Sequence, residues 1–205
     1  MNDAAPRVAL TFDAEHPDRP SCPPGNAERI LDVLAEAGAR ATFFIQGRWA
    51  EAQPATARRI ADEGHLVGHH SKFHARMPLL SDEGIRADVT AAEDSIREIT
   101  GADPRPWFRC PFGAGHNDPR VLRLLGELGY RDVSWHVELA DWEPDRTAEA
   151  IARDAVGGAL SHGDGAVVLL HTWPGPTGEA LPEILHNLSA GGARLVRIDE
   201  LETTP

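Results

Sequence analysis

Short apolar runs and longer stretches with a helical period alternate along the chain. Each apolar run has the length and the flanking turn residues of a buried β-strand. The predicted strands are residues 7–12, 41–45, 107–109, 133–135, 166–170 and 195–198. The run at 166–170 is the longest and most hydrophobic, and its length fits a buried strand rather than a membrane span.

Helical periodicity follows most of these runs. The clearest helix begins after Ser81, a residue type that favours the N-cap position, and carries its apolar residues along one stripe. Other helices are predicted to begin near Asn26, Pro54, Asp118, Thr147 and Thr177. This alternation implies an α/β fold with a mainly parallel sheet, either open or closed into a barrel. In such folds the reactive groups gather at the carboxyl ends of the strands.

The composition is that of one soluble globular domain. The chain has 205 residues, enough to bury a substantial core, and no repeat or linker interrupts residues 1–205. Because the formal net charge is −12, we expect no nucleic-acid partner and no membrane insertion. The first residues lack the basic and apolar segments of a signal peptide. We therefore expect a cytoplasmic protein, or a secreted one whose signal segment is missing from this sequence.

Two histidines four residues apart, His70 and His74, form the strongest local signal for a metal site. On one helical turn their imidazoles would face the same way and could hold one ion. The plainer interpretation is a pair of surface or hydrogen-bonded histidines, since the chain contains 10 of them.

Two carboxylates, Asp13 and Glu15, close the first predicted strand. If the strand stays extended to Glu15, both side chains point to the same side, because side chains alternate with period two. One carboxylate could then bind a metal while the other acts as a general base. The plainer interpretation is a polar strand end that leads into a loop.

Polar residues follow three later strands as well. Arg109 precedes a tight turn at residues 111–113, where an arginine could orient a carboxylate and backbone N–H groups could face an oxyanion. Asp141 and Trp142 follow the strand at 133–135, and His171 ends the strand at 166–170. Each has a plainer interpretation: a surface arginine, a packed tryptophan, a structural histidine.

The order and spacing of these residues resemble the polysaccharide deacetylases of carbohydrate esterase family 4, the NodB-homology domain. The resemblance extends over residues 8–201. The five matching motifs are 9–13, His70-Ser71-x-x-His74, Arg109-x-Pro111-x-Gly113, Asp141-Trp142 and Leu169-x-His171, and 41–44 with Gly47 resembles the family's second strand. Five motifs in the right order are far more specific than any one of them.

The resemblance implies a distorted (β/α) barrel with about seven parallel strands. It also implies metal-dependent removal of N-acetyl groups from amino sugars of chitooligosaccharide, peptidoglycan or a related N-acetylated glycan. In the family's pattern Asp13 is the catalytic base, Arg109 holds it, His171 is the general acid, and Asp141 favours the imidazolium form of His171. His70 and His74 bind the metal. The backbone N–H of Phe112 helps to stabilise the oxyanion, and Trp142 and Leu169 line the acetyl pocket.

The first motif departs from the family, because the second of its two adjacent aspartates is Ala14 here. We favour Glu15 as the third metal ligand, since some relatives place the two acids one residue apart. Asp13 itself or His16 could serve instead, or the site could be weakened. Histidine and glutamate ligands suit Zn²⁺, and Co²⁺ or Ni²⁺ would fit the same set.

Two other functions are compatible with the sequence. Relatives with separated acids include hydrolases of small non-sugar amides or cyclic imides. The loss of an aspartate at Ala14 is also compatible with a non-catalytic carbohydrate-binding homologue.

Overall fold

The computed structural model describes residues 5–16 and 22–202, which form two compact units. The first unit contains residues 5–12, 22–42 and 135–202, and the second contains residues 13–16 and 43–134. The stretch 17–25, whose Pro- and Gly-rich composition predicts a loop, lies partly outside the described residues. None of the helices in the described part is long and apolar enough to cross a membrane. The prediction of one domain over 1–205 stays a prediction.

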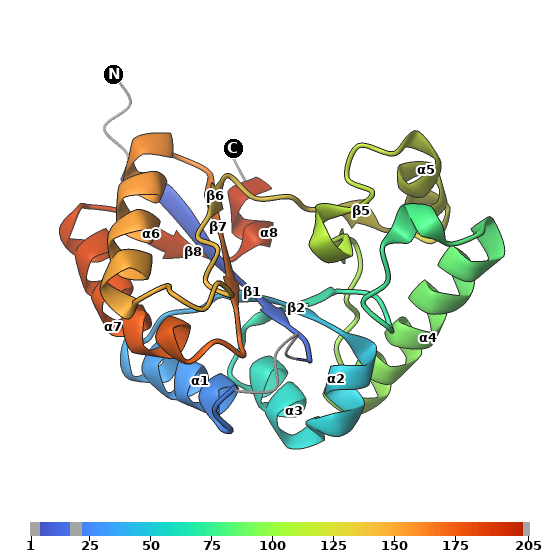
Figure 1. Ribbon diagram of the computed structural model, residues 1–205, viewed down its shortest axis with the longest axis horizontal. Coiled ribbons are helices and arrows are strands. Elements are labelled where there is room, and N and C mark those ends of the chain that lie inside the picture. The colour runs from blue at the N-terminus through green and yellow to red at the C-terminus, as the bar shows by residue number, and fades with distance from the viewer. Residues whose placement is uncertain (1–4, 17–21, 203–205) are drawn as a thin grey trace. The chain divides into compact units, whose positions relative to one another are not determined.

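The first unit is built on the strands β1 (Arg7–Ala14), β6 (Val137–Glu138), β7 (Ala166–His171) and β8 (Arg194–Val196). Strand β7 lies between β1 and β6, and β8 pairs with the other edge of β1. The β1–β8 and β6–β7 pairings are parallel. The helices are α1 (Asn26–Glu36), α6 (Ala148–His162), α7 (Gly175–Ala190) and α8 (Ile198–Glu202). Helices α6 and α7 lie side by side (Figure 1).

The second unit contains the strands β2 (Thr42–Ile45), β3 (Leu66–His69), β4 (Trp107–Phe108) and β5 (Arg131–Asp132), in the order β2-β3-β4-β5. Of β2, the residues from Phe43 onward belong to this unit. The β3–β4 and β4–β5 pairings are parallel. Its helices are α2 (Gly47–Ala52), α3 (Pro54–Asp62), α4 (Asp82–Thr100) and α5 (Pro119–Glu127), with 3-10 turns at Met77–Leu79 and Pro111–Gly113. Apolar residues of α4, β4 and α5 form one buried cluster.

Local capping chemistry explains where the helices begin. The Ser81 hydroxyl accepts a hydrogen bond from Gly84 N at 3.1 Å at the start of α4. Asp118 caps α5 in the same way, through Arg120 N at 2.9 Å. Each cap satisfies a backbone donor that the first helical turn leaves without a partner. The predicted starts of these helices at Ser81 and Asp118 are therefore confirmed.

The strand predicted at 133–135 is wrong. Pairing with β4 ends soon after Asp132, with one further bond from Val133 N to Phe108 O at 2.7 Å. The chain passes from the second unit to the first between residues 134 and 135, and pairing resumes when His136 N donates to Val167 O at 2.9 Å. Two short strands, β5 and β6, therefore flank the predicted one. Strand β3 was not predicted, because its four residues lie in a histidine-rich segment without a long apolar run.

Candidate active site

Two carboxylates at the end of β1 lie against the same imidazole. Asp13 Oδ2 is 3.5 Å and Glu15 Oε2 is 3.2 Å from His70 Nε2, and all three side chains are buried. Because side chains alternate along an extended chain, Ala14 faces the opposite side. The backbone stays extended to Glu15, as the sequence pattern required for this pair.

The histidine pair comes from a loop and not from a helix, so the predicted helical turn is wrong. His70 follows β3 directly, and the chain then turns tightly, with positive φ at Ser71 (60°) and at His74 (57°). These left-handed residues bring the rings of His70 and His74 to 5.0 Å between centroids. The spacing of four residues therefore works through a tight loop, not through a helical period.

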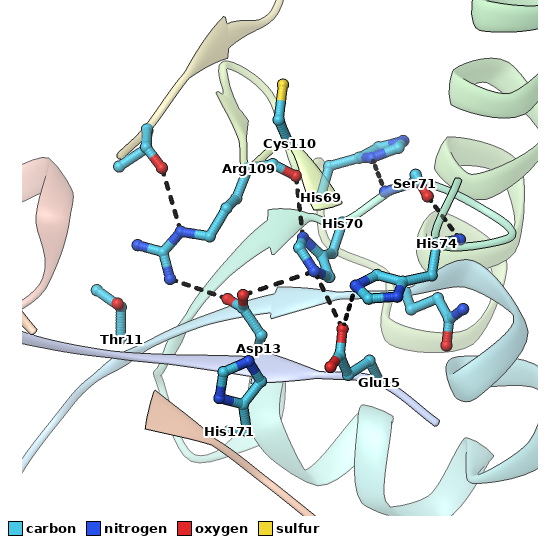
Figure 2. Close-up of polar contacts among 12 residues, drawn as sticks. Thr11, Asp13, Glu15, His69, His70, Ser71, His74, Arg109, Cys110 and His171 are labelled. Carbon is cyan, nitrogen blue, oxygen red and sulfur yellow. Dashed lines mark hydrogen bonds and ion pairs between the residues drawn. The ribbon is translucent and has the colours of Figure 1, made fainter. Parts of the chain in front are cut away.

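Glu15, His70 and His74 form a group that could hold a metal ion (Figure 2). One ligand atom of each residue lies within 4.8 Å of the others, and Glu15 Oε2 is 2.6 Å from His74 Nε2. His70 Nδ1 lies 2.9 Å from the carbonyl oxygen of Arg109, so the proton on Nδ1 leaves Nε2 as the ligand atom. Two imidazole nitrogens and one carboxylate are a common donor set of catalytic zinc sites. Among the described residues, neither Asp13 nor His16 belongs to this group.

Burial and negative charge act in opposite directions on His70. Burial, the largest single effect, lowers its pKa, but the adjacent carboxylates of Asp13 and Glu15 together raise the pKa above its ordinary value. The protonated form of His70 competes with a metal ion for the same nitrogen, so metal binding is expected to weaken as pH falls.

Arg109 fixes the position of Asp13. Its Nη1 donates to Asp13 Oδ1 at 2.9 Å and its Nε donates to Val133 O at 3.1 Å. The guanidinium also lies over the Phe44 ring, 4.1 Å from the centroid, and the side chain is completely buried. These contacts leave the carboxylate one orientation, with its other oxygen toward His70.

A neutral histidine, His69, supports the loop that carries His70 and His74, called the ligand loop below. The sequence did not suggest this residue. His69 Nε2 lies 3.0 Å from Val89 O, and its Nδ1 accepts a hydrogen bond from Ser71 N at 3.0 Å. Burial lowers the pKa of His69 to about 3, so the ring is neutral at ordinary pH. The proton on Nε2 and the lone pair on Nδ1 then satisfy both partners.

Asp88 supports the same loop from helix α4. Its two carboxylate oxygens accept hydrogen bonds from Lys72 N at 2.9 Å and from Phe73 N at 3.2 Å. Asp88 is buried, which raises the pKa of its carboxyl, and it lies beside Val89 on the apolar stripe of the helix. A carboxylate inside such a stripe is the sequence signal that could have identified this residue.

Phe112 lies beside the ligand loop, at the centre of the tight turn Pro111–Gly113. Its backbone has φ of 57°, and its ring lies 4.3 Å from that of His74. Phe112 is 48% exposed, so its ring borders solvent.

The first unit holds the other predicted residues in a separate network around Asp141. Asp141 Oδ1 lies 2.8 Å from His171 Nδ1, and Oδ2 accepts hydrogen bonds from His171 N (2.8 Å) and Thr177 Oγ1 (2.6 Å). Trp142 packs edge-on against the imidazole at 5.1 Å. Leu169 is buried in β7, two residues before His171 and therefore on the same side of the strand. Sequence reasoning missed Thr177, which is buried near the start of α7.

The structure thus groups the predicted residues in two sets. Asp13, Glu15, His70, His74, Arg109 and Phe112 lie in the second unit, and Asp141, Trp142, Leu169 and His171 lie in the first.

The sequence matches known deacetylases over nearly its whole length. The polysaccharide deacetylase family model matches residues 1–133. The chain is 31% identical over 201 residues to a peptidoglycan-N-acetylglucosamine deacetylase of Bacillus cereus, covering 96% of this chain and 68% of that protein. It is 30% identical over 164 residues to a chitooligosaccharide deacetylase of Azorhizobium caulinodans, covering 80% and 72%.

Solved structures show the same fold. A family 4 carbohydrate esterase from Streptomyces lividans in complex with acetate matches with a TM-score of 0.80 and 29% identity, covering 93% of this chain and 92% of that one. A carbohydrate esterase family 4 pseudoenzyme from Bacillus anthracis matches with a TM-score of 0.84 and 26% identity, covering 98% and 66%. The predicted α/β fold, the (β/α) barrel of the NodB-like deacetylases, is confirmed.

Proposed function

This chain belongs to the polysaccharide deacetylase family, and we propose that it is a metal-dependent hydrolase that removes N-acetyl groups from the amino sugars of a glycan. One observation carries the proposal: Glu15, His70 and His74 converge beside a carboxylate, Asp13, that a buried arginine holds in place. The relatives named for peptidoglycan and chitooligosaccharide support these two polymers as the substrate class.

Glu15, His70 and His74 would hold the ion. Their donor atoms suit Zn²⁺, and Co²⁺ or Ni²⁺ would fit the same set. When bound, the ion would supply the Lewis acidity that amide hydrolysis needs at neutral pH.

We assign proton transfer to two residues of this chain. Asp13, fixed by Arg109, accepts a proton from the attacking water as general base. His171 donates a proton from Nε2 to the departing amine, because its Nδ1 faces the Asp141 carboxylate, which stabilises the imidazolium form. Without that proton the amine is a poor leaving group.

Three residues are assigned to substrate binding. The Phe112 backbone N–H would face the developing oxyanion, since the tight turn fixes its direction. Trp142 and Leu169 would surround the acetyl methyl group with apolar surface.

A non-catalytic role has one observation in its favour, the alanine at position 14, and a pseudoenzyme is among the similar structures. Glu15 opposes this alternative, because its carboxylate already lies against both imidazoles. We therefore retain the enzymatic function.

Acetate release is the direct test. The purified protein, loaded with Zn²⁺, is incubated with N-acetylglucosamine oligomers, with peptidoglycan glycan strands and with small cyclic imides. We expect acetate from at least one N-acetylated glycan, no turnover of the imides, and loss of acetate release on chelation. If the protein binds Zn²⁺ stoichiometrically and releases acetate from none of the glycans, the proposed function is wrong. Turnover of the imides alone would favour the small-amide alternative.

A further inference from the structure

An arginine, Arg76, extends the aromatic contacts of the metal-ligand loop toward solvent. Its guanidinium carbon lies 4.2 Å from the centroid of the Phe112 ring, and that ring lies 4.3 Å from the ring of His74. A continuous series of contacts therefore leads from a candidate metal ligand to an exposed cation. All three residues belong to the second unit.

The backbone of the turn fixes the Phe112 ring, which lies between His74 and Arg76 in this series of contacts. Gly113 N donates to Cys110 O and Ala114 N donates to Pro111 O, both at 2.9 Å. Phe112 is therefore held in its left-handed conformation with its ring half exposed. A flat cation on a fixed aromatic ring loses less freedom on binding a ligand than a free arginine would.

The charge environment and the position of the guanidinium together distinguish Arg76. Although the chain carries 32 acidic residues, no ion pair of Arg76 is present among residues 5–16 and 22–202. By contrast, Arg120 and Arg123, which lie in the same unit, both pair with Asp82. Arg58 also forms no ion pair among the described residues, so what distinguishes Arg76 from it is the position of its guanidinium over the Phe112 ring. A planar guanidinium that none of the described carboxylates neutralises is suited to bind one from a ligand, and it can do so through two parallel hydrogen bonds.

We propose that Arg76, supported by Phe112, binds a carboxylate of the substrate, so that the preferred substrate is an acidic N-acetylated glycan. This inference rests on the proposed function. A neutral amino-sugar polymer offers hydroxyls and amides to such a group, but no anion. Because a single aromatic ring separates Arg76 from His74, the carboxylate lies on the reacting sugar or on a group attached next to it.

Two sources could provide this carboxylate: an acidic substituent of the sugar itself, or a peptide attached to the sugar. The test therefore uses three substrates: peptidoglycan glycan strands freed of peptide, the same strands with peptide, and neutral N-acetylglucosamine oligomers. Each is given to the wild type, Arg76→Gln, Arg76→Lys and Arg58→Gln. Arg58 is an exposed arginine on α3 and serves as the matched control.

We expect Arg76→Gln to raise KM for the acidic strands about tenfold, the range for a lost charge-assisted hydrogen bond. Its kcat, its zinc content and its activity on neutral oligomers should stay close to wild type. The KM of Arg76→Lys should lie between those of the wild type and Arg76→Gln, and Arg58→Gln should leave the KM unchanged. A KM effect on peptide-free strands assigns the carboxylate to the sugar; an effect confined to peptide-bearing strands assigns it to the peptide.

Equal losses on acidic and neutral substrates would overturn the inference, because Arg76 would then merely support Phe112 and His74. No change on any substrate would overturn it as well. Direct binding of the strands with and without peptide, measured by calorimetry, separates this failure from failure of the proposed function. If either kind of strand binds the wild type more tightly than Arg76→Gln, the inference is supported even without acetate release; equal binding of both kinds contradicts it.

Discussion

The two units each pair histidine with buried carboxylate, but in opposite arrangements. In the first unit one carboxylate, Asp141, accepts three hydrogen bonds, two from His171 and one from Thr177. In the second unit two carboxylates, Asp13 and Glu15, lie against one imidazole, and Glu15 also reaches His74. In the proposed function the Asp141 carboxylate would orient a single proton donor, whereas the converging carboxylate and imidazoles would hold a metal ion. The same two residue types would thus serve two kinds of chemistry.

The largest effect is expected from removing a ligand of the second unit. In His74→Ala we expect the affinity for Zn²⁺ to fall by at least about 100-fold, since changes to outer-shell partners alone cost 10- to 100-fold. Acetate release should fall with it. Zinc titration and an acetate assay measure the two quantities.

His16→Ala is the control for this substitution, because His16 follows Glu15 but lies outside the ligand group among the described residues. It should bind Zn²⁺ as the wild type does. If His16→Ala loses as much affinity for Zn²⁺ as His74→Ala does, His16 and not Glu15 is the third ligand.

Removing the assigned base should separate chemistry from metal binding. In Asp13→Asn we expect kcat to fall by about 10²- to 10⁴-fold, the usual contribution of a general base, while the affinity for Zn²⁺ stays near wild type. Steady-state kinetics and zinc titration check the two halves. If Zn²⁺ affinity falls as steeply as kcat, Asp13 is a ligand and the division of roles between Asp13 and Glu15 is wrong.

A smaller effect is expected in the network of the first unit. In Asp141→Asn, His171 loses the carboxylate that stabilises its imidazolium form, and we expect kcat to fall by about 10²-fold. Thr177→Val removes only one of the three hydrogen bonds to Asp141, so its loss of kcat should be clearly smaller. Zinc content should not change in either variant. Equal losses of kcat in the two would mean that Thr177 has a role beyond orienting Asp141.

The smallest effect is expected in the free energy of unfolding, and it comes from His69, the neutral histidine that supports the ligand loop. Because burial lowers the pKa of His69 from 6.5 to about 3, the unfolded chain takes up a proton below pH 6.5 that the native state refuses. The free energy of unfolding should therefore fall as pH drops from 6.5 toward 3, by up to about 1.4 kcal/mol per pH unit from this residue. Urea unfolding at pH 7 and pH 5 measures this slope.

His69→Gln should show a shallower pH dependence than the wild type. His186→Gln, which changes an exposed histidine on α7, should keep the wild-type slope. Identical slopes in His69→Gln and the wild type would mean that His69 is charged in the native state.

Features with a local cause could be predicted from the sequence. The caps at Ser81 and Asp118 depend on neighbours within three residues, and the shared orientation of Asp13 and Glu15 follows from strand geometry alone. The family resemblance supplied the fold, which the structural matches confirm.

Features set by distant contacts could not be predicted in this way. The loop geometry of His70 and His74 depends on Asp88, a residue of helix α4 whose carboxyl group lies in an apolar stripe. The Thr177 contact with Asp141 joins residues 36 positions apart with no motif between them. Residues 133–135 form no strand, because the chain passes from one unit to the other there.

The complete burial of Arg109 makes folding and activity depend on one side chain. Its guanidinium packs on Phe44 and forms an ion pair with Asp13, so a variant at this position disturbs the core and the site together. A charge buried without its partner is strongly destabilising. Random mutagenesis selected only for soluble protein should therefore already exclude most replacements at position 109, before any selection for deacetylation is applied.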